Sequence, residues 1–170
     1  MASSLLLDTH ALLWWLVEPE KLSPLAHAAI NDPAARVFVS AASGWEIATK
    51  GRLGKLPGAE QLLQDLPSVL QQQGFEPLAV QLHHGVHAGG YRQAHRDPFD
   101  RLLAAQAELE GLQLVSLDPV LATFPGRVLW CRHEHLCPGS QPADSCSPSR
   151  FGGAQARCAG RWVLLHLCTL

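Results

Sequence analysis

Cysteine is absent from the first 130 residues of this 170-residue chain, and all five cysteines follow Trp130. This absence excludes a disulfide framework or a thiolate metal site within residues 1–130. The chain also lacks any apolar run close to the roughly 18 residues of a membrane-spanning helix, and its N-terminus lacks the basic region of a secretory signal. We therefore expect a soluble protein with a cytoplasmic location.

An excess of basic charge is missing as well. The net charge of -2 excludes nucleic-acid binding through overall charge, so any such contact needs a local basic patch. Apolar residues, in contrast, are plentiful. A length of 170 residues with 47% hydrophobic content predicts one substantial core and one domain rather than two.

The composition changes sharply after Trp130. Residues 131–170 are rich in cysteine, proline, glycine and serine and are largely without helical or strand periodicity. We interpret them as an irregular, poorly ordered C-terminal appendage. Two alternatives stay open: an extension produced by an altered reading frame, and a zinc site, for which the spacing is not the paired Cys-x-x-Cys arrangement. The residues of that zinc site would be Cys131, His133, His135 and Cys137.

Strand-like and helix-like segments alternate before that change. The predicted strands cover residues 5–7, 36–39, 77–80, 112–116 and 128–130. The predicted helices cover 11–16, 24–30, a segment capped by Ser40 that includes 45–47, 61–72 and 97–108. This alternation predicts an α/β fold with a mostly parallel central sheet between two layers of helices.

Four carboxylates lie at the boundaries of these segments: Asp8, Glu46, Asp100 and Asp118. The carboxyl ends of parallel strands face one crevice, so Asp8 and Asp118 should point into the same space. Like charges held a few ångströms apart need a cation, and oxygen ligands suit Mg²⁺ or Mn²⁺. A bound metal activates water and stabilises phosphoryl charge. The pattern therefore predicts a metal-dependent hydrolase of phosphodiesters.

Several neighbouring polar residues have two interpretations. Asp97 and Asp118 each precede a proline, so each is either a helix N-cap worth about 1 kcal/mol or a carboxylate at the metal. Thr9 and Ser116 either orient a carboxylate or water at the site, or form ordinary caps.

Basic residues near the carboxylates could hold phosphates beside a metal without reading bases, or could simply balance the acidic charge or stay solvated. They are Lys50, Arg52, Lys55, Arg92, His95, Arg96 and Arg101. A second group, His83, His84 and His87, resembles a metal cluster. We favour a surface helix there over a second metal site.

Three blocks of the sequence resemble the PIN-domain ribonuclease toxins of the VapC type. They are residues 5–16, residues 43–50 with 53–56, and residues 95–107, and the resemblance covers about residues 4–130. It identifies residues 1–130 as a PIN-like nuclease domain with a three-layer sandwich fold. Ser116 and Gly44 depart from the usual pattern, where threonine and a bulkier residue are common.

The resemblance implies the toxin of a type II toxin–antitoxin system. Such a toxin is a metal-dependent endoribonuclease that uses Mg²⁺ or Mn²⁺, is neutralised by a cognate antitoxin and is usually a homodimer. Asp8, Glu46, Asp100 and Asp118 match the four acidic positions, and Asp97 is a further candidate. Two other functions remain: a catalytically weak PIN-like binding module, and a metal-dependent DNA nuclease or phosphatase.

Overall fold

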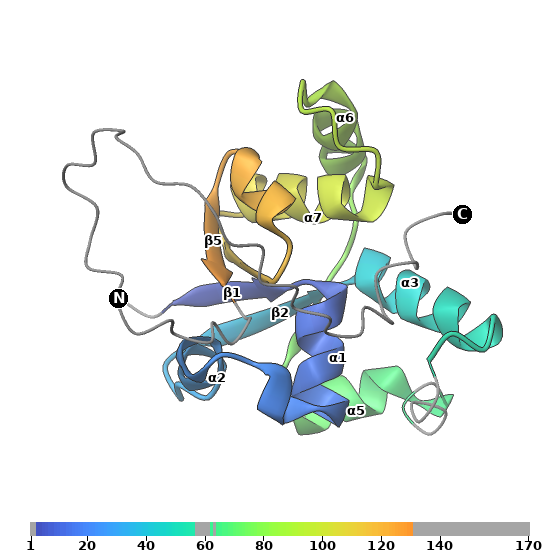
Figure 1. Ribbon diagram of the computed structural model, residues 1–170, viewed down its shortest axis with the longest axis vertical. Coiled ribbons are helices and arrows are strands. Elements are labelled where there is room, and N and C mark those ends of the chain that lie inside the picture. Colours follow the sequence, from blue (N-terminus) through green and yellow to red (C-terminus); the bar gives the residue numbers. More distant parts are fainter. Residues whose placement is uncertain (1–2, 57–61, 63, 131–170) are drawn as a thin grey trace, which may run out of the picture. The chain divides into compact units, whose positions relative to one another are not determined.

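A sheet of five strands forms the centre of the domain that the described residues make up, and every strand pairing in it is parallel. The computed structural model describes residues 3–56, 62 and 64–130. The strands are β1 (Ser4–Leu7), β2 (Arg36–Ser40), β3 (Glu76–Leu78), β4 (Gln113–Ser116) and β5 (Arg127–Trp130). Their order is β3-β2-β1-β4-β5, which puts β1 in the middle (Figure 1).

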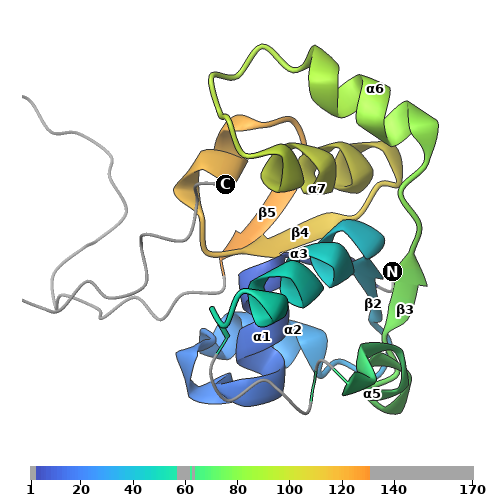
Figure 2. The same ribbon diagram turned by 90° about the vertical axis from the view of Figure 1, so that its right-hand side faces the viewer.

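Helices cover both faces of this sheet, with α6 and α7 on one side and α1, α2 and α5 on the other (Figure 2). The helices are α1 (Thr9–Val17), α2 (Pro24–Ile30), α3 (Ala41–Arg52), α5 (Leu66–Gln72), α6 (Leu82–Gly90) and α7 (Pro98–Leu109), with 3-10 turns at Pro19–Lys21 and Pro119–Thr123. The three-layer α/β prediction is therefore confirmed. No helix among the described residues is both long and apolar enough to cross a membrane.

The alternation of side chains along β1 explains the two cores. Leu5 and Leu7 point into the cluster that includes α1, α2 and Ile47 of α3, whereas Leu6 points into the cluster formed with α7 and β4. All three leucines are fully buried. A strand that is covered on both faces needs apolar side chains on both, so its sequence is a continuous apolar run, as it is in residues 5–7.

Short polar side chains begin most of these helices. Asp8, Ser23, Ser40 and Asp97 each accept a hydrogen bond from a backbone N–H in the first turn, and Asp118 does the same for the 3-10 turn that follows β4. Such caps satisfy N–H groups that have no partner within the helix. Three of these caps directly follow the strands β1, β2 and β4 or lie within two residues of them.

The predicted boundaries differ from the observed ones in small ways. The strand predicted at 77–80 is β3 at Glu76–Leu78, and the helix predicted at 61–72 is described as α5 from Leu66. The predicted appendage, with Cys131, His133, His135 and Cys137, lies outside the described residues.

Gly44 offers a test of the helix that carries Glu46. No atom lies within 4 Å of the position that a Cβ would take at Gly44, and the backbone there is helical. We expect Gly44→Ala to raise the free energy of unfolding by about 0.5–1 kcal/mol, measured by urea denaturation of the full chain. Gly111→Ala is the matched control, because Gly111 has a φ of +66° and alanine should be destabilising there. A loss of stability in Gly44→Ala would contradict the argument.

Candidate active site

Asp8 lies at the end of the central strand β1 and is only 4% exposed. One carboxylate oxygen accepts a hydrogen bond from the Ala11 N–H at 2.7 Å, and the other accepts one from the Ser116 hydroxyl at the end of β4. Burial raises the pKa of Asp8, while the charge of His10 and these hydrogen bonds oppose the rise. Asp8 is therefore a desolvated carboxylate that the neighbouring strand holds in place.

Asp100 lies in the first turn of α7, where Asp97 is the N-cap. Burial, together with the charges of Asp97 and Asp8, raises the pKa of Asp100 to about 7, although a hydrogen bond from His95 opposes the rise. His95 Nε2 lies 2.7 Å from Asp100 Oδ2. Asp8, Asp97 and Asp100 therefore share one poorly solvated region. Asp97 is the N-cap that the sequence allowed, because its carboxylate accepts from the Phe99 N–H at 2.8 Å, and its role at a metal stays a prediction.

Glu46 lies on α3, beside the first turn of α1. Thr9 donates to Glu46 Oε2 at 2.6 Å, and Lys50 Nζ lies 2.6 Å from Glu46 Oε1. The ring of Trp45 stacks on that of Phe99 at 5.1 Å between centroids. Because Trp45 precedes Glu46 and Phe99 precedes Asp100, this stacking brings the acidic segments of α3 and α7 together.

Asp118 follows β4, the strand beside β1. Its backbone N–H donates to the Ser116 hydroxyl at 3.0 Å, so Ser116 connects the backbone of Asp118 to the carboxylate of Asp8. The Asp118 carboxylate itself accepts from the Val120 N–H at 2.8 Å. This contact with Val120 is the one expected of an N-cap. A role of Asp118 at a metal stays a prediction that depends on its position just after β4.

Arg101, which the sequence left open between phosphate binding and charge balance, binds backbone carbonyls of its own chain. Its guanidinium donates to the carbonyl groups of Ala88, Tyr91, Gln93 and His95, at 2.7 to 3.1 Å. These carbonyls belong to the end of α6 and the segment that leads to α7. Arg101 therefore fixes the segment that carries His95. Arg52, Lys55, Arg92 and Arg96 are exposed.

The histidine-rich segment forms α6, which confirms the predicted helix, but His84 is fully buried and not on the surface. His84 Nδ1 accepts from the Gln81 N–H, so Nε2 carries the ring proton and donates to Glu110 at 3.0 Å. In the part of the chain that the structure describes, His83, His84 and Glu110 are the one group of potential metal ligands within 4.8 Å of one another. Since both nitrogens of His84 are engaged, we assign it a capping role.

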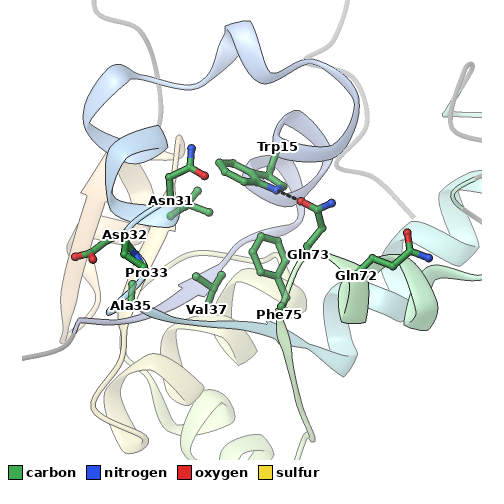
Figure 3. Close-up of a pocket in the computed structure, with 11 residues that line it drawn as sticks. Trp15, Asn31, Asp32, Pro33, Ala35, Val37, Gln72, Gln73 and Phe75 are labelled. Carbon is green, nitrogen blue, oxygen red and sulfur yellow. Dashed lines mark hydrogen bonds between the residues drawn. The ribbon is translucent and has the colours of Figure 1, made fainter.

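A pocket of about 320 Å³ lies near the amino ends of β2 and β3 (Figure 3). It is lined by residues that precede β2 and β3, among them Pro33 and Phe75, and by Trp15, whose indole N–H donates to Gln73 at 2.9 Å. The amino ends of parallel strands lie at the opposite edge of the sheet from their carboxyl ends. This pocket is therefore separate from the acidic site.

Gln106 is a buried residue near the acidic site that the sequence analysis missed. Its side-chain oxygen accepts from the Ser40 hydroxyl at 2.6 Å, and its nitrogen donates to the Ala79 carbonyl at 3.2 Å. Ser40 caps α3, so Gln106 joins α7 to the start of the helix that carries Glu46. A glutamine among the alanines of residues 104–107 is the signal that could have revealed it, because a polar residue on a buried helix face needs partners.

The described fold also matches a known family. Residues 5–126 match the model of the PIN domain. The chain belongs to the PIN-domain family. It is 33% identical to Ribonuclease VapC22 of Mycobacterium tuberculosis over 119 residues, which cover 68% of this chain and 88% of that protein. It is 40% identical to Ribonuclease VapC16 of the same organism over 60 residues, 35% of this chain and 43% of that protein, so this match spans less than half of VapC16.

Solved structures agree on the fold of this PIN domain. A DNA-bound VapBC from Salmonella typhimurium has a TM-score of 0.60 at 19% identity, covering 76% of this chain and 98% of that chain. VapBC2 from Rickettsia felis, bound to a DNA fragment from its promoter, has a TM-score of 0.58 at 15% identity, covering 75% and 98%. The resemblance to VapC-type PIN proteins is therefore confirmed.

The structural role of Arg101 can be tested by Arg101→Lys. A lysine keeps the charge but cannot reach four carbonyls at once, so we expect a loss of about 1–3 kcal/mol in the free energy of unfolding. Amide hydrogen exchange should also become faster across residues 91–97. Arg96→Lys is the control, because Arg96 is exposed. Equal stability of the two variants would refute the assignment.

Proposed function

We propose that this PIN domain is a metal-dependent endoribonuclease and the toxin of a type II toxin–antitoxin system. The observation that carries the proposal is the meeting of buried acidic groups at the strand ends, where Asp8 and Asp100 both have raised pKa values. Such groups mark functional sites more often than structural ones. The relatives named as ribonucleases support the choice of RNA.

A divalent cation suits this group of residues. The proposed ligands are Asp8, Glu46, Asp100 and Asp118, with Mg²⁺ as the physiological ion and Mn²⁺ as a substitute. A cation would offset the mutual repulsion and desolvation that raise the pKa of Asp8 and Asp100. Carboxylate oxygens suit Mg²⁺, which usually keeps several of its waters. When bound, the ion lowers the pKa of a coordinated water and stabilises phosphoryl charge.

The surrounding residues prepare the carboxylates for this task. Ser116 and Thr9 orient Asp8 and Glu46 through their hydroxyl groups, and His95 orients Asp100. Asp97 adds acidic charge beside Asp100 while it caps α7. The exposed cations Arg52, Lys55, Arg92 and Arg96 would bind the phosphate backbone without reading the base sequence.

The proposed partners are an antitoxin protein and a second copy of the chain, and the proposed location is the cytoplasm. The antitoxin is supported by the names of the solved neighbours, which are VapBC complexes bound to DNA. The homodimer follows from the resemblance to VapC-type toxins. Neither partner is needed to complete the carboxylate group described above, because all of its residues come from one chain.

The first test is RNA cleavage by the purified full chain with Mg²⁺ or Mn²⁺. We expect Asp8→Asn and Asp100→Asn to lower the rate by about 100-fold or more, because each removes a buried ligand charge. Asp118→Asn should have a smaller effect, since its observed contact is a helix cap. EDTA should abolish cleavage.

Asp32→Asn is the control for these variants, because Asp32 is exposed and lies before β2, at the other end of the sheet. Cleavage that survives both Asp8→Asn and Asp100→Asn would refute the mechanism. Equal cleavage of DNA of the same sequence would favour the DNA nuclease alternative, because only RNA carries the 2′-hydroxyl. A folded, metal-binding protein that cleaves neither would favour the binding-module alternative.

The toxin role has its own test. Expression of the chain in bacteria should arrest growth, and Asp100→Asn should relieve the arrest because it removes the activity without disturbing the surface. Colony counts after induction measure the effect, and co-expression of the cognate antitoxin should restore growth. Normal growth with an enzyme that is active in vitro would leave the ribonuclease assignment intact but contradict the toxin assignment.

A further inference from the structure

Lys50 is a buried cation inside the acidic site. It lies in the last turn of α3, and its side chain is 10% exposed while that of its partner Glu46 is 14% exposed. Lysine is rarely buried to this extent, because its ammonium group is strongly hydrated. The ion pair at 2.6 Å offsets the loss of hydration only while both charges are present. Lys50 therefore depends on Glu46 for its position.

Glu46 is fully engaged by groups of its own chain. Lys50 takes one carboxylate oxygen and the hydroxyl of Thr9 takes the other. The partners of the other two buried carboxylates differ in kind: Asp8 accepts from Ser116 and the backbone, and Asp100 pairs with His95. Among the carboxylates proposed as ligands, Glu46 is thus the one whose observed partner is a lysine.

We propose that Lys50 is a positioning residue that holds Glu46 Oε1 and competes with the divalent cation for this oxygen. When the cation occupies Glu46, the Lys50 ammonium is free to bind a phosphate oxygen of the RNA. This inference rests on the proposed metal-dependent function. It follows from the geometry, because a cation that binds Glu46 must share the carboxylate with an ammonium only 2.6 Å away. Two cations on one carboxylate repel each other.

The competition has a direction that can be measured. Loss of the Lys50 charge removes a competitor, so the metal should bind more tightly. The same loss removes a positive group beside the scissile phosphate, so cleavage at saturating metal should become slower. A lysine that only stabilised the fold would not move these two quantities in opposite directions.

The experiment is a calorimetric titration of the full chain with MnCl₂. We expect Lys50→Met to lower the dissociation constant for Mn²⁺ by about 5-fold or more, in the range usual for coupled sites, and to lower kcat for RNA at saturating Mn²⁺. Lys50→Arg should stay near the wild type because it keeps the charge. Lys21→Met is the matched control, since it breaks an ion pair of the same 2.6 Å length, with Glu18, at a more exposed position outside the acidic site and should change neither quantity.

A second background separates competition from a general change in charge. In Glu46→Gln, the substitution Lys50→Met should no longer tighten Mn²⁺ binding, because the shared carboxylate is gone. Lys50→Gln serves as a second neutral variant if Lys50→Met does not fold, and circular dichroism checks the fold of each protein.

Unchanged or weaker Mn²⁺ binding by a folded neutral variant overturns the inference while the proposed function stands. Mn²⁺ binding that Asp100→Asn leaves unaltered overturns the metal site itself, and the inference with it.

Discussion

The burial of the Asp8 carboxylate at the end of the central strand is the constraint on which the rest of the site depends. Desolvation disfavours its charge, so the chain must supply partners from several elements: the Ser116 hydroxyl from β4, the N–H of Ala11 from α1 and the charge of His10. These partners also fix where β4 ends relative to β1. The hydrogen bonds that hold the Asp8 carboxylate therefore also fix the register of β4 against β1. A change of this register would leave a buried carboxylate oxygen without its partner.

Three of the carboxylates proposed for the site are also helix caps. Asp8 caps α1, Asp97 caps α7, and Asp118 caps the 3-10 turn after β4. A cap places its oxygen at the start of a helix, where unpaired N–H groups lie, and in a parallel α/β fold these starts face the carboxyl ends of the strands. The need of each helix for an N-cap is therefore enough to place several acidic oxygens at the carboxyl ends of the strands. The choice between cap and ligand, which the sequence leaves open for Asp97, is not a choice between exclusive states.

Much of this arrangement can be predicted from the sequence because it depends on local patterns. Apolar runs that end at Asp8 and Ser116 indicate the ends of two strands. Asp8 and Ser116 then lie close together because these strands, β1 and β4, are neighbours in the sheet. The pairing of Arg101 with four carbonyls and the burial of His84 could not be predicted in this way, because each depends on how α6 packs on α7. A cation near acidic residues suggests phosphate binding or charge balance equally well, and only tertiary contacts decide between them. The sequence analysis therefore placed Asp8 correctly at the end of a strand. It left Arg101 open between phosphate binding and charge balance, and the structure shows it bound to backbone carbonyls.

The site balances its own charge only in part. Glu46 has Lys50 and Asp100 has His95, whereas the positive charge that acts on Asp8 is that of His10. The pKa values of Asp8 and Asp100 remain raised in spite of these partners, so the positive charge provided by the chain falls short of what the buried carboxylates require. A full set of lysine and arginine partners would give a stable acidic cluster with nothing left to bind. The shortfall at Asp8 and Asp100, beside a Glu46 that is already paired, is what makes this edge of the sheet suited to one additional divalent charge.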